Sequence, residues 1–211
     1  MRKRSPVRAP EETRSNLIAA AGRLFNSVGY YGTDSNRIAR QAGYAPGTFY
    51  VHFADKLEIF LEVYRGWVES EWQAITATVR PGRRPGGEGA RIARIVLAHH
   101  REWRMFRASL RALTVTEPRV HDARVAERKR QIARTAEQLR ARGVTPPPAR
   151  IYANLLLFEI LCDAVADGDT AKLGIRESEI LARLAADTDE LLDAKGGPTK
   201  SSSSVRPPGG T

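Results

Sequence analysis

Apolar side chains recur at helical spacing along nearly the whole of this 211-residue chain. The first run places Leu17, Ala21, Leu24 and Val28 three or four residues apart, and Gly29 ends it. Proline and glycine divide the rest of the sequence into further segments of the same pattern. No segment shows the apolar–polar alternation of a half-buried strand. The pattern therefore predicts an all-α fold.

Helix start and stop signals set the expected bounds of these helices. The expected helices cover residues 10–28, 33–42, 46–53, 56–79, 90–116 (as two helices), 120–142, 150–167 and 177–194. Thr33 is the expected N-cap of the second helix, because a threonine hydroxyl accepts a hydrogen bond from a free backbone N–H. Asp55, followed three residues later by Glu58, resembles a capping box and opens the long fourth helix.

The composition is that of a folded protein with an excess of positive charge. The formal net charge is +10, from 34 Lys and Arg against 24 Asp and Glu, and 42% of the residues are hydrophobic. The basic excess indicates a polyanionic partner, although a surface that simply prefers arginine is the alternative interpretation. Residues 1–56 are basic and residues 150–195 are acidic, so the two ends are expected to have different roles. The single cysteine excludes a disulfide framework and a cysteine-rich zinc module.

The sequence predicts no association with a membrane. The most apolar stretch, residues 151–166, is interrupted by Asn154, Glu159 and Asp163, which excludes a membrane span. The basic start of the chain is not followed by the apolar region that a secretory signal needs. We therefore expect a cytoplasmic protein.

The first three helices form a helix-turn-helix pattern, because Gly43-Tyr44-Ala45 separates the second from the third. Ile38, Ala39, Phe49 and Phe53 are expected to face the core of this unit. The opposite face of the third helix has little bulk at its start and hydroxyls and an imidazole beyond; it carries Gly47, Thr48, Tyr50, Val51 and His52. Helix-turn-helix units place such a face in the major groove of DNA. Double-stranded DNA is therefore the predicted partner.

In this helix-turn-helix region, the sequence resembles the TetR family of transcriptional regulators. The resemblance covers residues 13–60 and runs through Leu17–Ala21, Leu24-Phe25, Gly29-Tyr30, Thr33, Ile38-Ala39, Ala42-Gly43, Gly47–Tyr50, His52-Phe53 and Lys56. It implies a homodimer in which each subunit joins an N-terminal DNA-binding domain to a C-terminal regulatory domain. The function it implies is that of a repressor that binds a palindromic operator and is released by a small-molecule effector.

The resemblance also implies individual DNA contacts. It assigns phosphate contacts to Thr33, Tyr50 and Lys56, and groove contacts to Pro46, Gly47, Thr48 and His52. Beside these, Arg37 is available to the DNA backbone, and Tyr44 either stacks on the backbone or packs inside the domain. Ala45 stands where the family usually has Ser or Thr. The third helix then lacks a side-chain cap, at a cost of about 1 kcal/mol.

Four regions are expected along the chain. They are a flexible basic arm (residues 1–9), a helix-turn-helix DNA-binding domain (10–54), a regulatory and dimerisation domain (55–195) and a disordered tail (196–211). Arg2, Lys3, Arg4 and Arg8 equip the arm either to enter the minor groove or to remain solvated. Apolar residues on the helices within 150–193 form a stripe wider than one subunit needs, which predicts dimerisation there.

Six residues are candidates for an apolar effector cavity, with ordinary core packing as the alternative for each. They are Tyr64, Trp67, Trp103, Phe106, Leu110 and Phe158. Two other classes of protein remain as alternatives: an enzyme that uses His99, His100 or Cys162, and a basic architectural protein without effector control. None of the three residues has metal-ligand spacing or a catalytic signature, so we expect no enzyme activity, metal or cofactor.

Overall fold

The computed structural model describes residues 10–78 and 87–193, which form ten α-helices and no strand. The helices are α1 (Pro10–Val28), α2 (Ser35–Gln41), α3 (Pro46–His52), α4 (Lys56–Thr78), α5 (Glu88–Glu102), α6 (Arg104–Thr116), α7 (Pro118–Arg140), α8 (Pro148–Ala166), α9 (Asp169–Lys172) and α10 (Glu177–Asp193). The all-α prediction is confirmed. The predicted arm at residues 1–9 and the predicted tail at residues 196–211 lie outside the described residues.

The helix bounds follow the sequence signals to within about two residues, for reasons visible in the hydrogen bonds. The predicted capping box opens α4: Asp55 accepts a hydrogen bond from the Glu58 N–H, and the Glu58 carboxylate accepts one from the Ala54 N–H, both at 2.6 Å. The segment 90–116 divides into α5 and α6 at Trp103, as predicted. The four-residue helix α9 was not expected, because a single turn is too short to show a periodic pattern.

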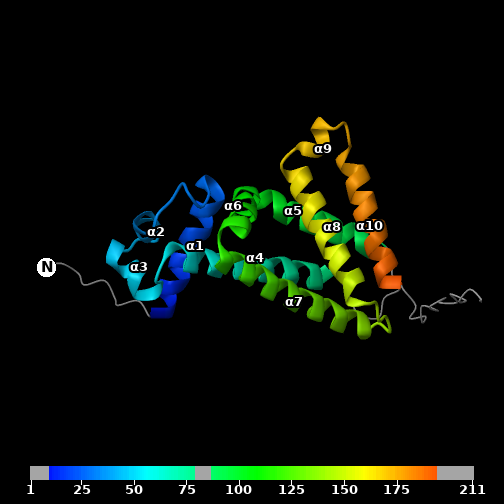
Figure 1. Cartoon of the computed structure of the whole chain (residues 1–211), viewed down its shortest axis with the longest axis horizontal. Coiled ribbons are helices and arrows are strands. Elements are labelled where there is room, and N and C mark those ends of the chain that lie inside the picture. The colour runs from blue at the N-terminus through cyan, green and yellow to red at the C-terminus, as the bar shows by residue number, and fades with distance from the viewer. Residues whose placement is uncertain (1–9, 79–86, 194–211) are drawn as a thin grey trace, which may run out of the picture.

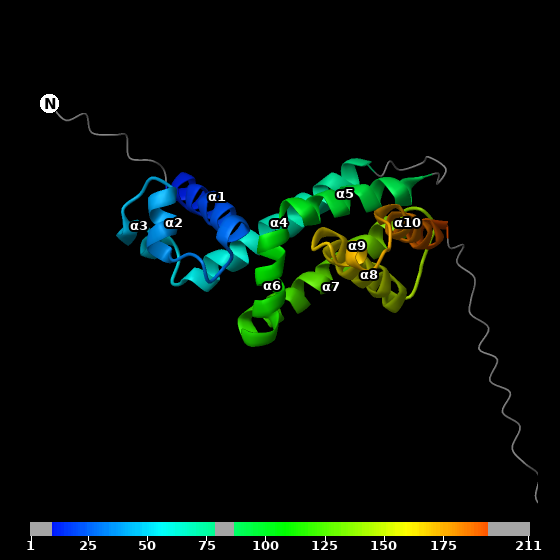
Figure 2. The same ribbon diagram turned by 90° about the horizontal axis from the view of Figure 1, so that it is seen from above.

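The molecule is elongated, with the helix-turn-helix unit at one end (Figures 1 and 2). Helices α1, α2 and α3 form this end, and α4 leads from it into the middle of the molecule. Helices α8 and α10 lie side by side toward the other end, joined through α9. Helices α5 and α7 occupy the space between them and α4.

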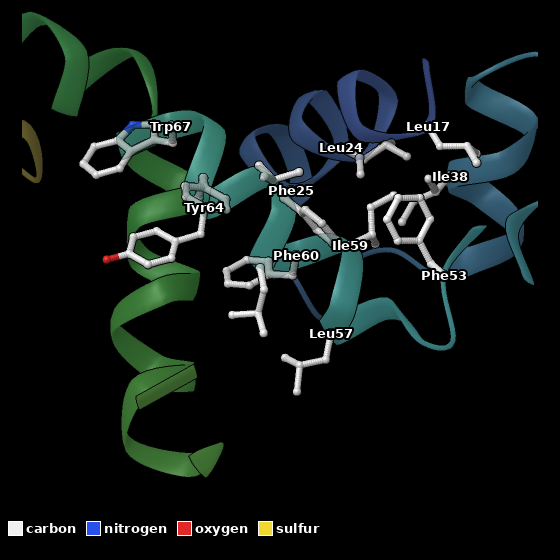
Figure 3. Close-up of a cluster of buried hydrophobic side chains, with 14 of the residues drawn as sticks. Leu17, Leu24, Phe25, Ile38, Phe53, Leu57, Ile59, Phe60, Tyr64 and Trp67 are labelled. Carbon is white, nitrogen blue, oxygen red and sulfur yellow. The ribbon is translucent and has the colours of Figure 1, made fainter. Parts of the chain in front are cut away.

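The main hydrophobic core continues from the helix-turn-helix unit into the rest of the chain. It joins Leu17 and Phe25 of α1 to Phe60 of α4 and to Phe106 of α6, all of which are buried. Figure 3 shows side chains of α1, α2 and α4 in this cluster, with Tyr64 and Trp67 further along α4. The predicted domain boundary at residues 54–55 lies between α3 and α4, so packed side chains cross it. Helices α4 and α6 are thereby in direct packing contact with α1.

Polar contacts also fasten α1 to the junction of α5 and α6. The Asn26 amide donates to the Glu102 carbonyl at 2.6 Å and accepts from the Phe106 N–H at 3.3 Å. The Tyr30 N–H donates to the Ser109 hydroxyl at 3.0 Å. These bonds complement the apolar contacts of the core and fix the orientation of α6 against α1.

Helices α5 and α10 approach closely at Gly89. A Cβ atom at this position would lie 2.3 Å from the Ala185 carbonyl oxygen, which is closer than van der Waals contact allows. The Gly89 N–H donates to the Asp189 carboxylate at 2.9 Å. Glycine is therefore required here for the close packing of α10 on α5.

Candidate functional site

The turn between α2 and α3 has the geometry that the sequence predicts. Gly43 adopts a φ of 82°, in the left-handed region where an L side chain is strained. The Tyr44 N–H donates to the Ala39 carbonyl at 2.9 Å, and the Gly43 N–H donates to the Arg40 carbonyl at 3.0 Å. These two bonds form a Schellman motif, which ends α2 and turns the chain toward α3.

The N-cap of α2 is Asp34, so the prediction of Thr33 at this position was wrong. The Asp34 carboxylate accepts a hydrogen bond from the Arg37 N–H at 2.8 Å. The charged carboxylate also interacts more favourably with the helix dipole than a hydroxyl does. Thr33 is buried, and its hydroxyl has no hydrogen-bond partner in the part of the chain that the structure describes.

Helix α3 presents uncharged side chains to solvent on one side and is held to the core by buried phenylalanines on the other. Phe49 and Phe53 are buried against the core, as predicted. Pro46 and Gly47 are exposed, Tyr50 is 60% exposed, and Thr48 is half-buried. The expected absence of a side-chain cap at Ala45 is confirmed, and Pro46 is the first helical residue. The start of α3 thus presents its backbone to solvent with little side-chain bulk over it.

Lys56 is held inside the N-terminal unit and not extended into solvent. Its ammonium group donates to the carbonyl oxygens of Tyr30 and Thr33, both at 2.9 Å. The same nitrogen lies 4.0 Å from the centroid of the Tyr30 ring. Burial lowers the pKa of Lys56. Lys56 therefore clamps the turn between α1 and α2 through two of its three N–H donors.

The other residues predicted to face DNA lie near α3 and differ in their exposure and in their hydrogen-bond partners. Arg37 is exposed, and its guanidinium donates to the Gly32 carbonyl at 2.9 Å. The Tyr44 hydroxyl accepts from the Asn16 amide at 3.0 Å, and its ring packs against the core. His52 ends α3 and is half-buried. Tyr44 thus packs inside the domain, as one of its two expected roles requires.

A cavity of about 140 Å³ lies among the helices of the C-terminal part. Its wall is formed by residues of α4, α5, α6, α7, α8 and α10. Of the six predicted cavity residues, Tyr64, Trp67 and Phe158 line it. Phe106 and Leu110 lie in the main hydrophobic core, and Trp103 packs against that core beside Gly22 of α1.

Two residues of the cavity wall, His100 and Arg107, belong to a buried network of charges. Asp163 accepts from Arg107 at 2.7 Å and contacts the His100 imidazole at 2.8 Å. His100 also lies 3.5 Å from Glu71, and Arg107 lies 3.5 Å from Glu159. The network joins α4, α5, α6 and α8, and its members lie at the cavity or directly behind its wall.

The pKa values of this network favour the charged forms. Burial disfavours the imidazolium form of His100, but the carboxylates of Asp163 and Glu71 outweigh burial and raise the pKa of His100. Burial likewise opposes ionisation of the acids, yet hydrogen bonds from His100 and Arg107 lower the pKa of Asp163. Contacts with His100 and His99 lower the pKa of Glu71 to about 2 against the same opposition from burial.

The raised pKa of His100 predicts that stability decreases above neutral pH. The favourable contribution of the imidazolium is complete below its ordinary pKa of 6.5 and is lost as the pH rises through its higher folded-state pKa. We expect the unfolding free energy to fall as the pH rises from about 6.5 through the folded-state pKa of His100, by at most about 1.4 kcal/mol per pH unit. Urea unfolding of the wild type and of His100→Gln over this range is the measurement. Equal slopes for the two proteins would contradict the assignment to His100.

The outer surface of α8 carries exposed apolar side chains. Tyr152, Leu156 and Ile160 repeat every four residues and are 44%, 36% and 56% exposed. Ile151 and Phe158, on the inner side of the same helix, are buried. The part of the predicted stripe that exceeds one subunit's core is therefore accessible on α8.

The three candidate catalytic residues do not form a reactive site. Burial raises the pKa of the Cys162 thiol to about 12, so the thiol stays protonated at neutral pH and is a poor nucleophile. His100 is engaged by Asp163, and His99 stacks on Trp67 with ring centroids 4.9 Å apart. Residues 10–78 and 87–193 contain no group of three metal-ligating side chains placed to hold an ion. Within the same ranges, no helix has the length and apolar character needed to cross a membrane.

Sequence reasoning missed six polar residues of the cavity wall that lie on α7 or in the turn directly after it. They are Arg124, Arg128, Gln131, Thr135, Gln138 and Arg142. Their spacing of three and four residues is the signal that identifies them, because it places them on one face of the helix.

Comparison with known proteins supports the helix-turn-helix assignment. Residues 17–63 match the profile of the bacterial regulatory proteins of the tetR family. The HTH-type transcriptional regulator AcrR of Shigella flexneri is 37% identical over 70 residues, which cover 30% of this chain and 33% of AcrR. The regulator HbdR of Aromatoleum sp. is 37% identical over 65 residues, or 31% of this chain and 28% of HbdR. The chain thus matches about a third of the length of these relatives.

The likeness in fold extends further than the likeness in sequence. A crystal structure from Mesorhizobium loti, of a protein assigned to the TetR-family transcriptional regulators, superimposes with a TM-score of 0.62 at 25% identity. The superposition covers 90% of this chain and 97% of that one. The helix-turn-helix sequence matches the tetR family of bacterial regulatory proteins, and the fold of nearly the whole chain is similar to that of a protein assigned to the same family.

Proposed function

We propose that this chain is a transcriptional repressor that binds a palindromic operator as a homodimer and is released by a small-molecule effector. The observation that carries the proposal is the α2–α3 unit, in which a Schellman turn and two buried phenylalanines present an uncharged, accessible face of α3. A face of this kind at the end of an elongated molecule fits the major groove of DNA (Figure 1). We place the protein in the cytoplasm, with its DNA partner.

In this proposal each residue around α3 has a role that its position supports. Thr48 and Tyr50 bind base edges or phosphates from the accessible face, while Pro46 and Gly47 allow close approach. Arg37 and His52 flank the face, and the remaining donor of Lys56 is directed to a phosphate. Thr33 and Tyr44 contribute by holding the unit in shape.

The homodimer is proposed to form through the surface of α8 and α10, within residues 150–193. The exposed stripe of Tyr152, Leu156 and Ile160 on α8 supports this, since pairing with a second copy removes it from water. The two copies of α3 then read half-sites in adjacent major grooves, one turn or about 34–36 Å apart.

The proposed route of effector control runs from the cavity through α6 to α1. Arg107 of α6 lines the cavity, and α6 packs on α1 through Phe106 and the Asn26 bonds. An effector that changes the position of α6 therefore changes the position of the helix-turn-helix unit. To shift occupancy from 1:99 to 99:1, the effector must prefer the released conformation by about 5.5 kcal/mol.

Selection of bound sites from a random pool of DNA duplexes tests the proposed function. We expect the full chain to enrich an inverted repeat whose half-sites are about one helical turn apart. Enrichment of no sequence, with binding to all duplexes, would identify a basic architectural protein instead. Failure to retain any duplex would contradict DNA binding altogether.

A further inference from the structure

The cavity has two chemically different walls. Residues of α4 and α8 contribute aromatic and aliphatic surface, including Trp67, Trp72, Leu155 and Phe158. Helix α7 contributes almost entirely polar side chains at a spacing of three and four residues, from Arg124 to Arg142. A ligand that fills the cavity must therefore have an apolar body and at least one polar group.

Around Glu159, the polar wall of the cavity carries more positive than negative charge. Arg124 and Arg128 both pair with Glu159, and the three side chains are 20%, 20% and 13% exposed. Glu159 is also 3.5 Å from Arg107, whose main partner is Asp163. Within residues 10–78 and 87–193, Glu159 is the one acidic partner of both arginines, which leaves one positive charge unbalanced beside the cavity.

The other acidic side chain of the wall, Glu71, faces two imidazoles, although its Oε1 atom accepts no hydrogen bond within residues 10–78 and 87–193. Glu71 lies 3.4 Å from His99 and 3.5 Å from His100. Asp163 and Asp167, behind the wall, pair with Arg107 and Arg111. A cationic ligand would therefore compete with resident cations for each of these carboxylates, whereas an anion would meet the arginines that share Glu159.

Two donors in the cavity wall have no acceptor in the part of the chain that the structure describes. The indole nitrogen of Trp67 is buried without a hydrogen-bond partner, and the residue as a whole is only 4% exposed, so water does not reach this donor from outside. The amide nitrogen of Asn154 is in the same situation, and both residues line the cavity. A buried donor without a partner is costly, and a ligand that supplies acceptors removes the cost.

We propose that the cavity binds an amphipathic organic acid, with its carboxylate at Arg124 and Arg128 and its apolar body against Trp67 and Phe158. This inference rests on the proposed function only in taking the cavity as the effector site. The acid group shares the guanidinium donors with Glu159 and neutralises the excess charge. Further oxygen atoms on the body of the ligand accept from Trp67 and Asn154.

The choice of probes separates charge from shape. Biphenyl-4-carboxylate, biphenyl-4-carboxamide and 4-biphenylmethylamine share an apolar body and differ in the charge of one group. Their binding to the full-length chain without DNA is measured by isothermal titration calorimetry, with tryptophan fluorescence as a second readout because Trp67 and Trp72 line the cavity. We expect the carboxylate to bind at least about tenfold more tightly than the amide, and the amine most weakly. Equal or tighter binding of the amine, or no binding of the carboxylate, would overturn the proposal.

Two variants, one that removes a positive charge and one that removes a negative charge, test where the carboxylate of the ligand binds. Arg128→Gln is expected to abolish the preference for carboxylate over amide, while Glu159→Gln is expected to strengthen carboxylate binding because it removes the competing acid. Arg140→Gln is the matched control, since Arg140 is exposed on the same helix, does not line the cavity and donates to the Ala136 carbonyl. An unchanged preference in both cavity variants would contradict the site. Because DNA is absent, this result is independent of whether the chain reads an operator.

Discussion

The double variant Thr48→Ala/Tyr50→Ala is expected to bind the selected inverted repeat about a thousandfold more weakly than the wild type. Each subunit loses two side-chain hydrogen bonds to DNA, so a homodimer loses four. At about 1 kcal/mol for each bond, the loss amounts to about 4 kcal/mol, or roughly three orders of magnitude in affinity. Fluorescence anisotropy with a labelled duplex at one fixed salt concentration is the measurement.

The fold is expected to tolerate this double variant. Tyr50 is 60% exposed, and alanine has a higher helix propensity than either threonine or tyrosine. Leu173→Ala is a suitable control, because Leu173 is 74% exposed and lies beside α9, away from α3 (Figure 1). We expect wild-type affinity for the control. Wild-type affinity for the double variant as well would show that this face of α3 does not contact DNA.

Asp163→Ala is expected to destabilise the protein by about 3–5 kcal/mol, because it leaves two buried cations without their main partner. Arg107 and His100 both pair with Asp163, and both are 3% exposed. Water cannot replace the lost carboxylate at such depth without opening the packing of α5, α6 and α8. Urea unfolding followed by circular dichroism measures the change.

Asp169→Ala provides the exposed counterpart of this variant. Asp169 pairs with Lys172 at 3.2 Å, and both side chains are more than half exposed. Removal of this pair is expected to cost less than about 1 kcal/mol. If Asp163→Ala is no more destabilising than Asp169→Ala, the buried network does not stabilise the C-terminal helices in the way proposed above.

The sequence alone predicts the helices and the architecture of the DNA-facing unit because both depend on local signals. Gly43 ends α2 through its backbone conformation, and Asp55 with Glu58 opens α4 through bonds within one turn. The burial of Phe49 and Phe53 follows from their spacing on one face of α3. Features of this kind involve residues close in sequence, so a local pattern can specify them, although it placed the N-cap of α2 at Thr33, one residue before Asp34.

Features that depend on distant residues were harder to predict. Lys56 was expected to bind phosphate, yet two of its donors bind carbonyls 26 and 23 residues earlier in the chain. Phe106 and Leu110 were predicted to line the cavity, but α6 packs against α1 and α4 so that both side chains point into the main core. The pairing of Arg124 and Arg128 with Glu159 joins α7 to α8 and has no local signal. Long-range packing decides which apolar faces meet and where a cavity remains.

The central claim is that a homodimer reads a specific DNA sequence through the face of α3. The most direct test is the ratio of dissociation constants for the selected inverted repeat and for a scrambled duplex of the same composition, measured at the same salt concentration. Because specific recognition exceeds the electrostatic attraction of the +10 charge, we expect a ratio of about a thousand or more. Equal affinities for the two duplexes would contradict sequence-specific recognition and leave only charge-driven binding.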